Sequence, residues 1–173
     1  NYQALLDIDI QPTIVTDAET WRELLPRLEG STLVVDALLG TGVRGAAGGL
    51  CADVIGDLNT RFPRAQVVAV DMPSGMPPDT GEPAGLSVRA GHTVTFTAPK
   101  PSQVFPPNCF QVGALTVAPI GTAASVIESI PNLQLGLAEA RDFASLFVPR
   151  PPASHKGDYG HLLVIGGSRA KPG

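Results

Sequence analysis

The chain of 173 residues has little charge, since Asp, Glu, Lys and Arg make up 16% of it and the formal net charge is −4. Proteins that bind nucleic acid through its phosphates carry a basic surface, and this sequence provides none. Hydrophobic residues make up 43% of the chain, whereas disordered chains have few apolar residues and a high net charge. The composition therefore indicates a folded protein that does not bind nucleic acid.

Cysteines, histidines and long apolar runs are also scarce. Cys51 and Cys109 form neither a disulfide framework nor a metal-ligand cluster, which favours idle thiols in a reducing cytosol and a cytoplasmic location. No apolar run approaches the roughly 20 residues of a membrane span, and no signal peptide is evident. The spacing of His92, His155 and His161 argues against a zinc site. Ser74 does not stand in a GxSxG pattern and no His has an evident orienting acid, which argues against a Ser–His hydrolase.

Glycine and proline are abundant instead, with 19 Gly and 17 Pro. They fall between short apolar runs that predict strands at residues 33–35, 67–70, 93–97 and 114–117. The first two runs are typical of strands buried on both faces of a parallel sheet. Apolar positions at helical spacing predict one helix that starts at Thr16 or Asp17 and stops near Gly30, and a second between Leu50 and Arg61.

The alternation of strands and helices predicts an α/β fold with a Rossmann-like, mostly parallel sheet. Such sheets bind ligands beyond the carboxyl ends of their strands. Asp36, Asp71, Ser74, Lys100 and the glycines of residues 40–45 all follow predicted strand ends. We therefore expect these groups to gather at one rim of the sheet.

Residues 40–45 have the pattern GxGxxG directly after a strand. Glycines there let backbone N–H groups approach a phosphate at a helix N-terminus, and Arg44 adds a cationic partner. The alternative is an ordinary tight turn. The acid that precedes the glycines, Asp36, and the late position of Asp71 both depart from the usual dinucleotide fingerprint.

A second polar cluster covers residues 71–75. Asp71 could accept hydrogen bonds from ribose hydroxyls or bind a cation, and Ser74 could also ligate a hard cation. The alternative is a turn that closes a strand. Lys100, which stands between two prolines, is either an ammonium positioned near an anionic ligand or a solvated loop lysine.

The last part of the chain has a different character. Apolar positions between Leu135 and Leu146 predict a short amphipathic helix, and residues 149–152 read as an extended linker. Residues 162–165 predict a buried strand, followed by Gly166, Gly167 and Ser168. We interpret this strand as the first of a second domain.

Taken together, residues 35–42, 70–75 and 95–101 resemble the NAD(P)H-hydrate epimerase family in order and spacing. Residues 154–160 and 164–168 look like the opening of the ADP-dependent NAD(P)H-hydrate dehydratase domain, which has a ribokinase-like α/β fold. The resemblance implies an epimerase domain over residues 1–125, a linker over residues 126–152 and the start of a dehydratase domain over residues 153–173.

The resemblance also implies an activity: interconversion of the R and S forms of hydrated NADH or NADPH, followed in the full-length protein by ADP-dependent dehydration of the S form. It implies potassium ligands at Asp36 and Ser74, and a substrate-binding acid at Asp71. We assign a general acid/base role to Asp36 as well. The loop that would hold the hydrated nucleotide consists of Gly40, Thr41, Gly42, Val43, Arg44, Gly45 and Ala46.

The family's Asn- and Gly-rich first loop does not occur before Asn1, and the dehydratase pocket and ADP site do not follow Gly173. We therefore expect both domains to be truncated and the isolated chain to lack both activities, whereas the full-length protein is expected to be a homo-oligomer. Two other functions remain open: an NAD(P)-dependent dehydrogenase and a non-catalytic nucleotide-binding module.

Overall fold

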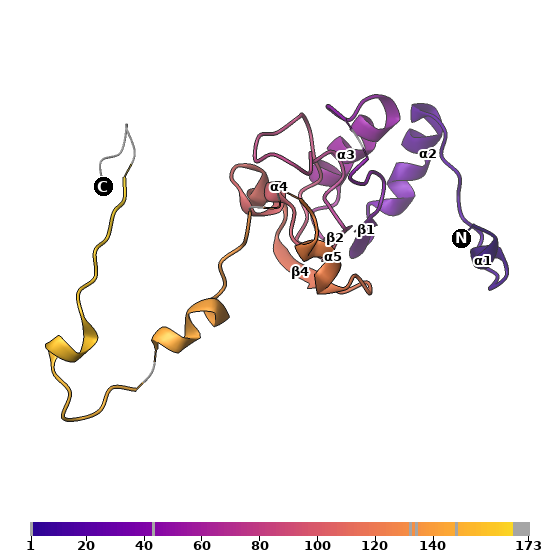
Figure 1. Cartoon of the computed structure of the whole chain (residues 1–173). Coiled ribbons are helices and arrows are strands. Elements are labelled where there is room, and N and C mark those ends of the chain that lie inside the picture. The colour runs from indigo at the N-terminus through magenta and orange to yellow at the C-terminus, as the bar shows by residue number, and fades with distance from the viewer. Residues whose placement is uncertain (1, 43, 132, 134, 148, 168–173) are drawn as a thin grey trace. The chain divides into compact units, whose positions relative to one another are not determined.

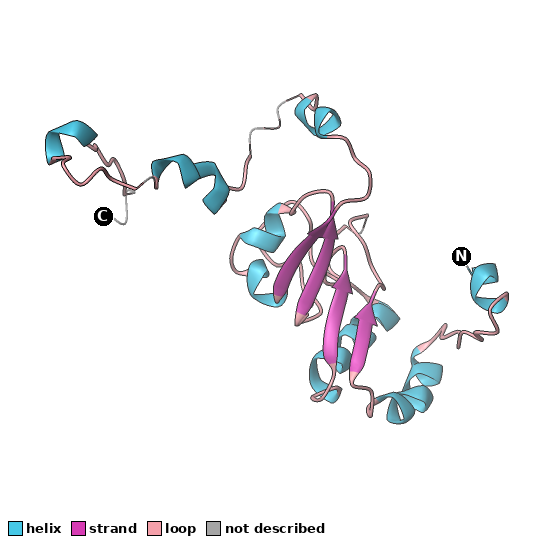
Figure 2. Ribbon diagram, turned by 90° about the horizontal axis from the view of Figure 1, so that it is seen from below, coloured by secondary structure: helices cyan, strands magenta, loops and turns pink. Residues whose placement is uncertain are grey.

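The computed structural model describes residues 2–42, 44–131, 133, 135–147 and 149–167. The chain divides into two compact units, residues 1–129 and residues 130–173. The first unit contains one parallel sheet of four strands in the order β1-β2-β3-β4 (Figures 1 and 2). These strands are β1 (Leu33–Asp36), β2 (Gln66–Val70), β3 (His92–Phe96) and β4 (Ala114–Ala118). The predicted α/β fold with a Rossmann-like parallel sheet is confirmed.

Two helices build the larger hydrophobic core against the sheet. They are α2 (Ala18–Leu28) and α3 (Gly49–Arg61). Of the two predicted caps, Asp17 is the one that starts α2: its carboxylate accepts a hydrogen bond from the Thr20 N–H at 2.8 Å. That bond is the main reason why the pKa of Asp17 lies below its ordinary value. The buried core consists of Trp21, Leu25, Val54, Ile55, Leu58, Phe62, Val67 and Val88.

The strand β1 is not buried on both faces, contrary to the prediction. Val34 packs against the core and Asp36 is buried, but Leu33 and Val35 are 58% and 59% exposed. The reason is that none of the described residues covers the face of the sheet to which these two side chains point. The alternation of exposed and more buried side chains along β1 is that of a sheet covered on one face.

Shorter elements complete the first unit: α1 (Tyr2–Leu6), α4 (Pro101–Val104), the 3-10 helix η1 (Asn108–Gln111) and α5 (Ala124–Glu128). A second, smaller core cluster of Met72, Met76 and Val112 lies beside Leu115. Among the residues that the structure describes, no helix has the length and apolar character needed to cross a membrane.

The second unit contains two 3-10 helices, η2 (Ala140–Leu146) and η3 (Lys156–Tyr159). Of the short amphipathic helix predicted between Leu135 and Leu146, the structure forms only η2. An amphipathic helix depends on packing of its apolar face, and here Leu135 and Leu146 are exposed. The described residues also form no strand at 162–165, where all four side chains are exposed and no strand pairs with them. Ser168 lies outside the described residues, and the ribokinase-like domain stays a prediction.

Candidate functional site

The structure brings the predicted polar residues to the carboxyl ends of neighbouring parallel strands. Asp36 is the last residue of β1, Asp71 follows β2 directly, and Lys100 follows β3 at the start of α4. Two separate contacts link them across the rim. Ser74 binds Asp36, and Lys100 binds Asp71.

The first contact is a buried pair. The Ser74 hydroxyl donates to Asp36 Oδ1 at 2.5 Å, and the Ser74 backbone N–H donates to Asp36 Oδ2 at 2.8 Å. The same hydroxyl accepts from the Leu39 N–H at 2.9 Å. Asp36 is 1% exposed and Ser74 is fully buried. The pair therefore ties the loop after β1 to the loop after β2, and both carboxylate oxygens are engaged.

The donor atoms of this pair suit a hard cation rather than a soft metal. Carboxylate, hydroxyl and backbone carbonyl oxygens are the ligands that hard cations prefer, and the Leu39 carbonyl lies 3.4 Å from the Ser74 hydroxyl. Nowhere among the described residues do three or more His, Cys, Asp or Glu side chains form a metal-binding group. Asp36 and Ser74 thus have the donor atoms that a hard cation such as potassium requires, with further oxygen ligands needed.

Both central strands end in a strained turn. Asp71 has a φ of 65°, and the N–H of Met72 donates to the Val70 carbonyl at 2.8 Å across it. Thr97 has a φ of 66°, and the N–H of Ala98 donates to the Phe96 carbonyl at 2.7 Å. A positive φ at a β-branched residue is rare. Such strain gathers at functional sites, and here it marks the rim at β2 and β3.

The carboxylate of Asp71 is held by several donors. Its Oδ1 accepts from Lys100 Nζ at 2.5 Å, from the Thr95 hydroxyl at 3.2 Å and from the Phe96 N–H at 3.3 Å. Burial raises the pKa of Asp71, but the hydrogen bonds from these three groups and the positive charge of Lys100 together lower that pKa below its ordinary value. Asp71 is therefore ionised at neutral pH.

The glycine-rich loop after β1 is open to solvent. The described members of the predicted loop, residues 40–42 and 44–46, are exposed, and Val43 lies outside the described residues. Gly45 needs glycine because its φ is 78°, but Gly40 and Gly42 have neither a positive φ in the range that requires glycine nor an atom within 4 Å of an added Cβ. Packing against the described residues therefore does not explain these two glycines.

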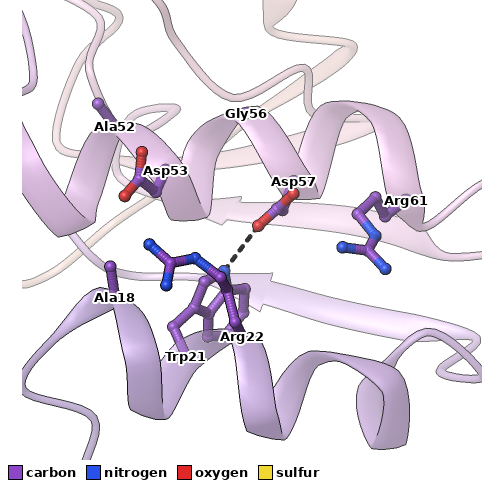
Figure 3. Close-up of a pocket in the computed structure, with 8 residues that line it drawn as sticks. All are labelled: Ala18, Trp21, Arg22, Ala52, Asp53, Gly56, Asp57 and Arg61. Carbon is purple, nitrogen blue, oxygen red and sulfur yellow. Dashed lines mark hydrogen bonds between the residues drawn. The ribbon is translucent and has the colours of Figure 1, made fainter.

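The groove between α2 and α3 is a different feature (Figure 3). It has a volume of about 400 Å³. On its floor the Trp21 indole N–H donates to Asp57 Oδ2 at 2.7 Å, which joins the two helices. The residues that line it are Ala18, Trp21, Arg22, Ala52, Asp53, Gly56, Asp57 and Arg61. None of them is a predicted site residue, so the groove lies outside the candidate site.

Two rim residues escaped the sequence analysis. Thr95 is fully buried with its hydroxyl on Asp71, and the buried Gln103 donates from Nε2 to the Asp71 carbonyl at 2.7 Å. The signal for Thr95 was its polar side chain within a predicted strand. No comparable signal was present for Gln103, because its hydrogen bond to the Asp71 carbonyl depends on where α4 lies relative to the end of β2.

Fold and rim together define a class: a parallel α/β domain with acidic and hydroxyl side chains at its strand ends beside a glycine-rich loop. A family described as "YjeF-related protein N-terminus" matches residues 2–102. The match covers more than half of the sequence, and the chain belongs to this family.

Several curated relatives carry the name bifunctional NAD(P)H-hydrate repair enzyme Nnr. The protein of Moorella thermoacetica is 41% identical over 136 residues, which cover 79% of this chain and 25% of the relative. That of Escherichia coli K12 is 37% identical over 84% of this chain and 27% of the relative. That of Thermofilum pendens is 36% identical over 98% of this chain and 31% of the relative. The chain thus spans roughly a quarter to a third of the length of these relatives.

Proposed function

We propose that the protein containing this chain repairs hydrated nicotinamide nucleotides, and that the first unit contributes to epimerisation of the R and S forms of hydrated NADH or NADPH. The observation that carries the proposal is the rim itself. The Asp36–Ser74 pair and the ionised Asp71 follow adjacent strands, beside an exposed glycine-rich loop. Family membership and the names of the relatives support the same activity.

In this proposal the loop of residues 40–46 holds the hydrated nucleotide. The open space beside Gly40 and Gly42 allows a ligand to approach the backbone without meeting a side chain. The exposed Arg44 offers a guanidinium to the negatively charged phosphates. Asp71 supplies acceptor oxygens for the hydroxyl groups of the substrate.

We also propose that Asp36 and Ser74 bind potassium. When bound, the cation would fix the two strand-end loops and add positive charge beside the substrate phosphates. A general acid/base role of Asp36 remains a second assignment, but its burial and its two engaged oxygens favour the ligand role. A proton-transfer group must come within hydrogen-bond reach of the substrate.

Residues 153–173 are proposed to begin the dehydratase part, which would use ADP as co-substrate to return the S form to NAD(P)H. Their resemblance to that domain supports this assignment. The homo-oligomeric state of the full-length protein also stays a proposal.

The test is to incubate the purified complete gene product with the R form of hydrated NADH and to follow its conversion to the S form by chromatography. We expect conversion at a rate that falls at least about tenfold in Asp71→Asn, the loss that corresponds to about 1.4 kcal/mol. Reduction of NAD(P) with a second substrate would instead favour a dehydrogenase, and nucleotide binding without turnover would favour a binding module.

Potassium is tested separately by thermal unfolding. Potassium at 100 times its dissociation constant should stabilise the protein by about 2.7 kcal/mol, and Asp36→Asn should abolish this gain. Equal stabilisation of both proteins would contradict the ligand assignment. Sodium chloride at the same ionic strength is the control.

A further inference from the structure

The function proposed above gives no role to Lys100. The hydrogen bonds of its side chain indicate one. Its ammonium donates to Asp71 Oδ1 at 2.5 Å, to the Thr95 hydroxyl at 2.7 Å and to the Phe96 carbonyl at 3.1 Å. A lysine ammonium has three N–H donors, and three protein acceptors use them all. Lys100 is therefore neither a solvated loop lysine nor a cation with a donor left for an anionic ligand.

The position of this ammonium is fixed by the start of α4. Lys100 is the N-cap of that helix, and its backbone N–H donates to Gln103 Oε1 at 2.8 Å. The amide of the same Gln103 donates to the Asp71 carbonyl at 2.7 Å. The beginning of α4 thus holds both the backbone and the side chain of Asp71.

The two oxygens of Asp71 have unequal surroundings. Oδ1 accepts all three of the hydrogen bonds that the carboxylate receives, from Lys100, Thr95 and Phe96. Oδ2 receives none from the part of the chain that the structure describes. The carboxylate is therefore anchored through one oxygen and presents the other.

We infer that Lys100 is a positioning residue: it does not contact the ligand, but holds the Asp71 carboxylate in an orientation in which Oδ2 accepts from a ligand hydroxyl. An ionised carboxylate oxygen only accepts hydrogen bonds and repels phosphate. The group that it recognises is thus a hydrogen-bond donor rather than a phosphate, and under the proposed function we assign it to a hydroxyl of the nucleotide ribose. This inference rests on the proposed function and assigns to Lys100 the orientation of its substrate-binding acid.

The test is a double-mutant cycle in the complete gene product with Lys100→Met, Asp71→Asn and both changes together. Two quantities are measured: the KM and kcat for epimerisation of hydrated NADH, and, independently of turnover, the Kd of NADH by calorimetry. We expect Lys100→Met to raise KM and Kd about tenfold with little change in kcat, as for a lost interaction that binds substrate and transition state alike. The double variant should bind no more weakly than Asp71→Asn, because Lys100 acts through Asp71.

Two further variants separate positioning from general stability. Thr95→Val removes a hydroxyl that both accepts from Lys100 and donates to Asp71, and should raise Kd in the same direction. Arg64→Met removes an exposed cation from the turn before β2, at the opposite end of the strand, and should leave Kd unchanged. Thermal unfolding of every variant reports its stability.

The outcomes test the positioning role of Lys100 separately from the proposed function. If Asp71→Asn weakens binding but Lys100→Met does not, or if their effects add in the double variant, the role of Lys100 is refuted and the proposed function stands. If Lys100→Met lowers only the unfolding temperature, its role is structural and the inference is again refuted. If Asp71→Asn leaves KM and Kd unchanged, the substrate-binding role of Asp71 in the proposed function fails as well.

Discussion

The Ser74→Ala variant tests whether the buried pair at the rim holds the site together. The substitution removes a hydroxyl that donates to Asp36 Oδ1 at 2.5 Å and accepts from the Leu39 N–H at 2.9 Å. Ser74 is fully buried, so water does not replace the lost hydroxyl. The backbone hydrogen bond from Ser74 to Asp36 Oδ2 remains.

The expected loss follows from these two contacts. A hydrogen bond to a charged group contributes about 1.5–3 kcal/mol, and loss of the partner of the partly buried Leu39 N–H adds about 1 kcal/mol. The sum predicts a destabilisation of about 3 kcal/mol. At about 2–4 °C per kcal/mol for a protein of this size, the unfolding temperature should fall by about 6–12 °C.

Urea unfolding in potassium-free buffer measures this loss directly. With a urea m-value of about 2 kcal/mol/M, the midpoint should fall by about 1.5 M while m stays unchanged. The control is Ser125→Ala, because Ser125 is exposed on α5 and surface substitutions change stability by less than about 0.5 kcal/mol. A loss in Ser74→Ala as small as in this control would refute the idea that the pair ties the two loops.

Four further predictions concern this unit. Gly75→Ala should destabilise the protein by at least about 3 kcal/mol in urea unfolding, because Gly75 has a φ of 90° and its new Cβ would lie 2.3 Å from a carbonyl oxygen. Gly42→Ala, which meets no atom within 4 Å, should leave stability within about 0.5 kcal/mol yet weaken NADH binding in calorimetry; unchanged binding would argue against the loop as a nucleotide site. Leu25→Ala should cost about 2–5 kcal/mol, since Leu25 is fully buried. Because the pKa of Asp71 is lowered on folding, its pairing with Lys100 stabilises the protein above the unfolded pKa and is lost as pH falls through the lower folded pKa. The stability difference between wild type and Lys100→Met should thus be constant from about pH 5 to 8 and shrink below about pH 4, and a difference that persists in acid would contradict the ion pair.

Local patterns were sufficient to predict the four strands and the two longer helices of the first unit, but not its short elements α1, α4, η1 and α5. The apolar runs predicted all four strands, and helical spacing with the Asp17 cap predicted α2. Each of these signals lies within a few neighbouring residues, so it can be recognised without knowledge of the fold. The gathering of polar residues at one rim was also predictable, because parallel strands bring their carboxyl ends to the same edge.

Contacts that depend on side-chain reach were not predictable. The sequence placed Lys100 at the rim but left its partner open, and nothing local indicated that Gln103 turns back to the Asp71 carbonyl. The prediction that β1 is buried was wrong for the same kind of reason. Whether the side chains on a face of a strand are buried depends on which elements cover that face. The predicted strand at residues 162–165 likewise requires a partner strand, and an apolar run alone does not supply one.

The two polar pairs at the rim differ in a way that separates their tasks. Asp36 and Ser74 are buried, and both oxygens of Asp36 are satisfied from within the protein. Asp71 is only partly covered and keeps one oxygen without a hydrogen bond from the described residues, while Lys100 fixes the other. A buried group can join loops or ligate a buried ion. To accept hydrogen bonds from the hydroxyls of a ligand, a carboxylate needs an accessible oxygen held in a fixed direction. The geometry therefore favours Asp71 over Asp36 as the residue that contacts substrate. The effect of Lys100→Met on the Kd of the nucleotide consequently tests the site more directly than the loss of stability in Ser74→Ala.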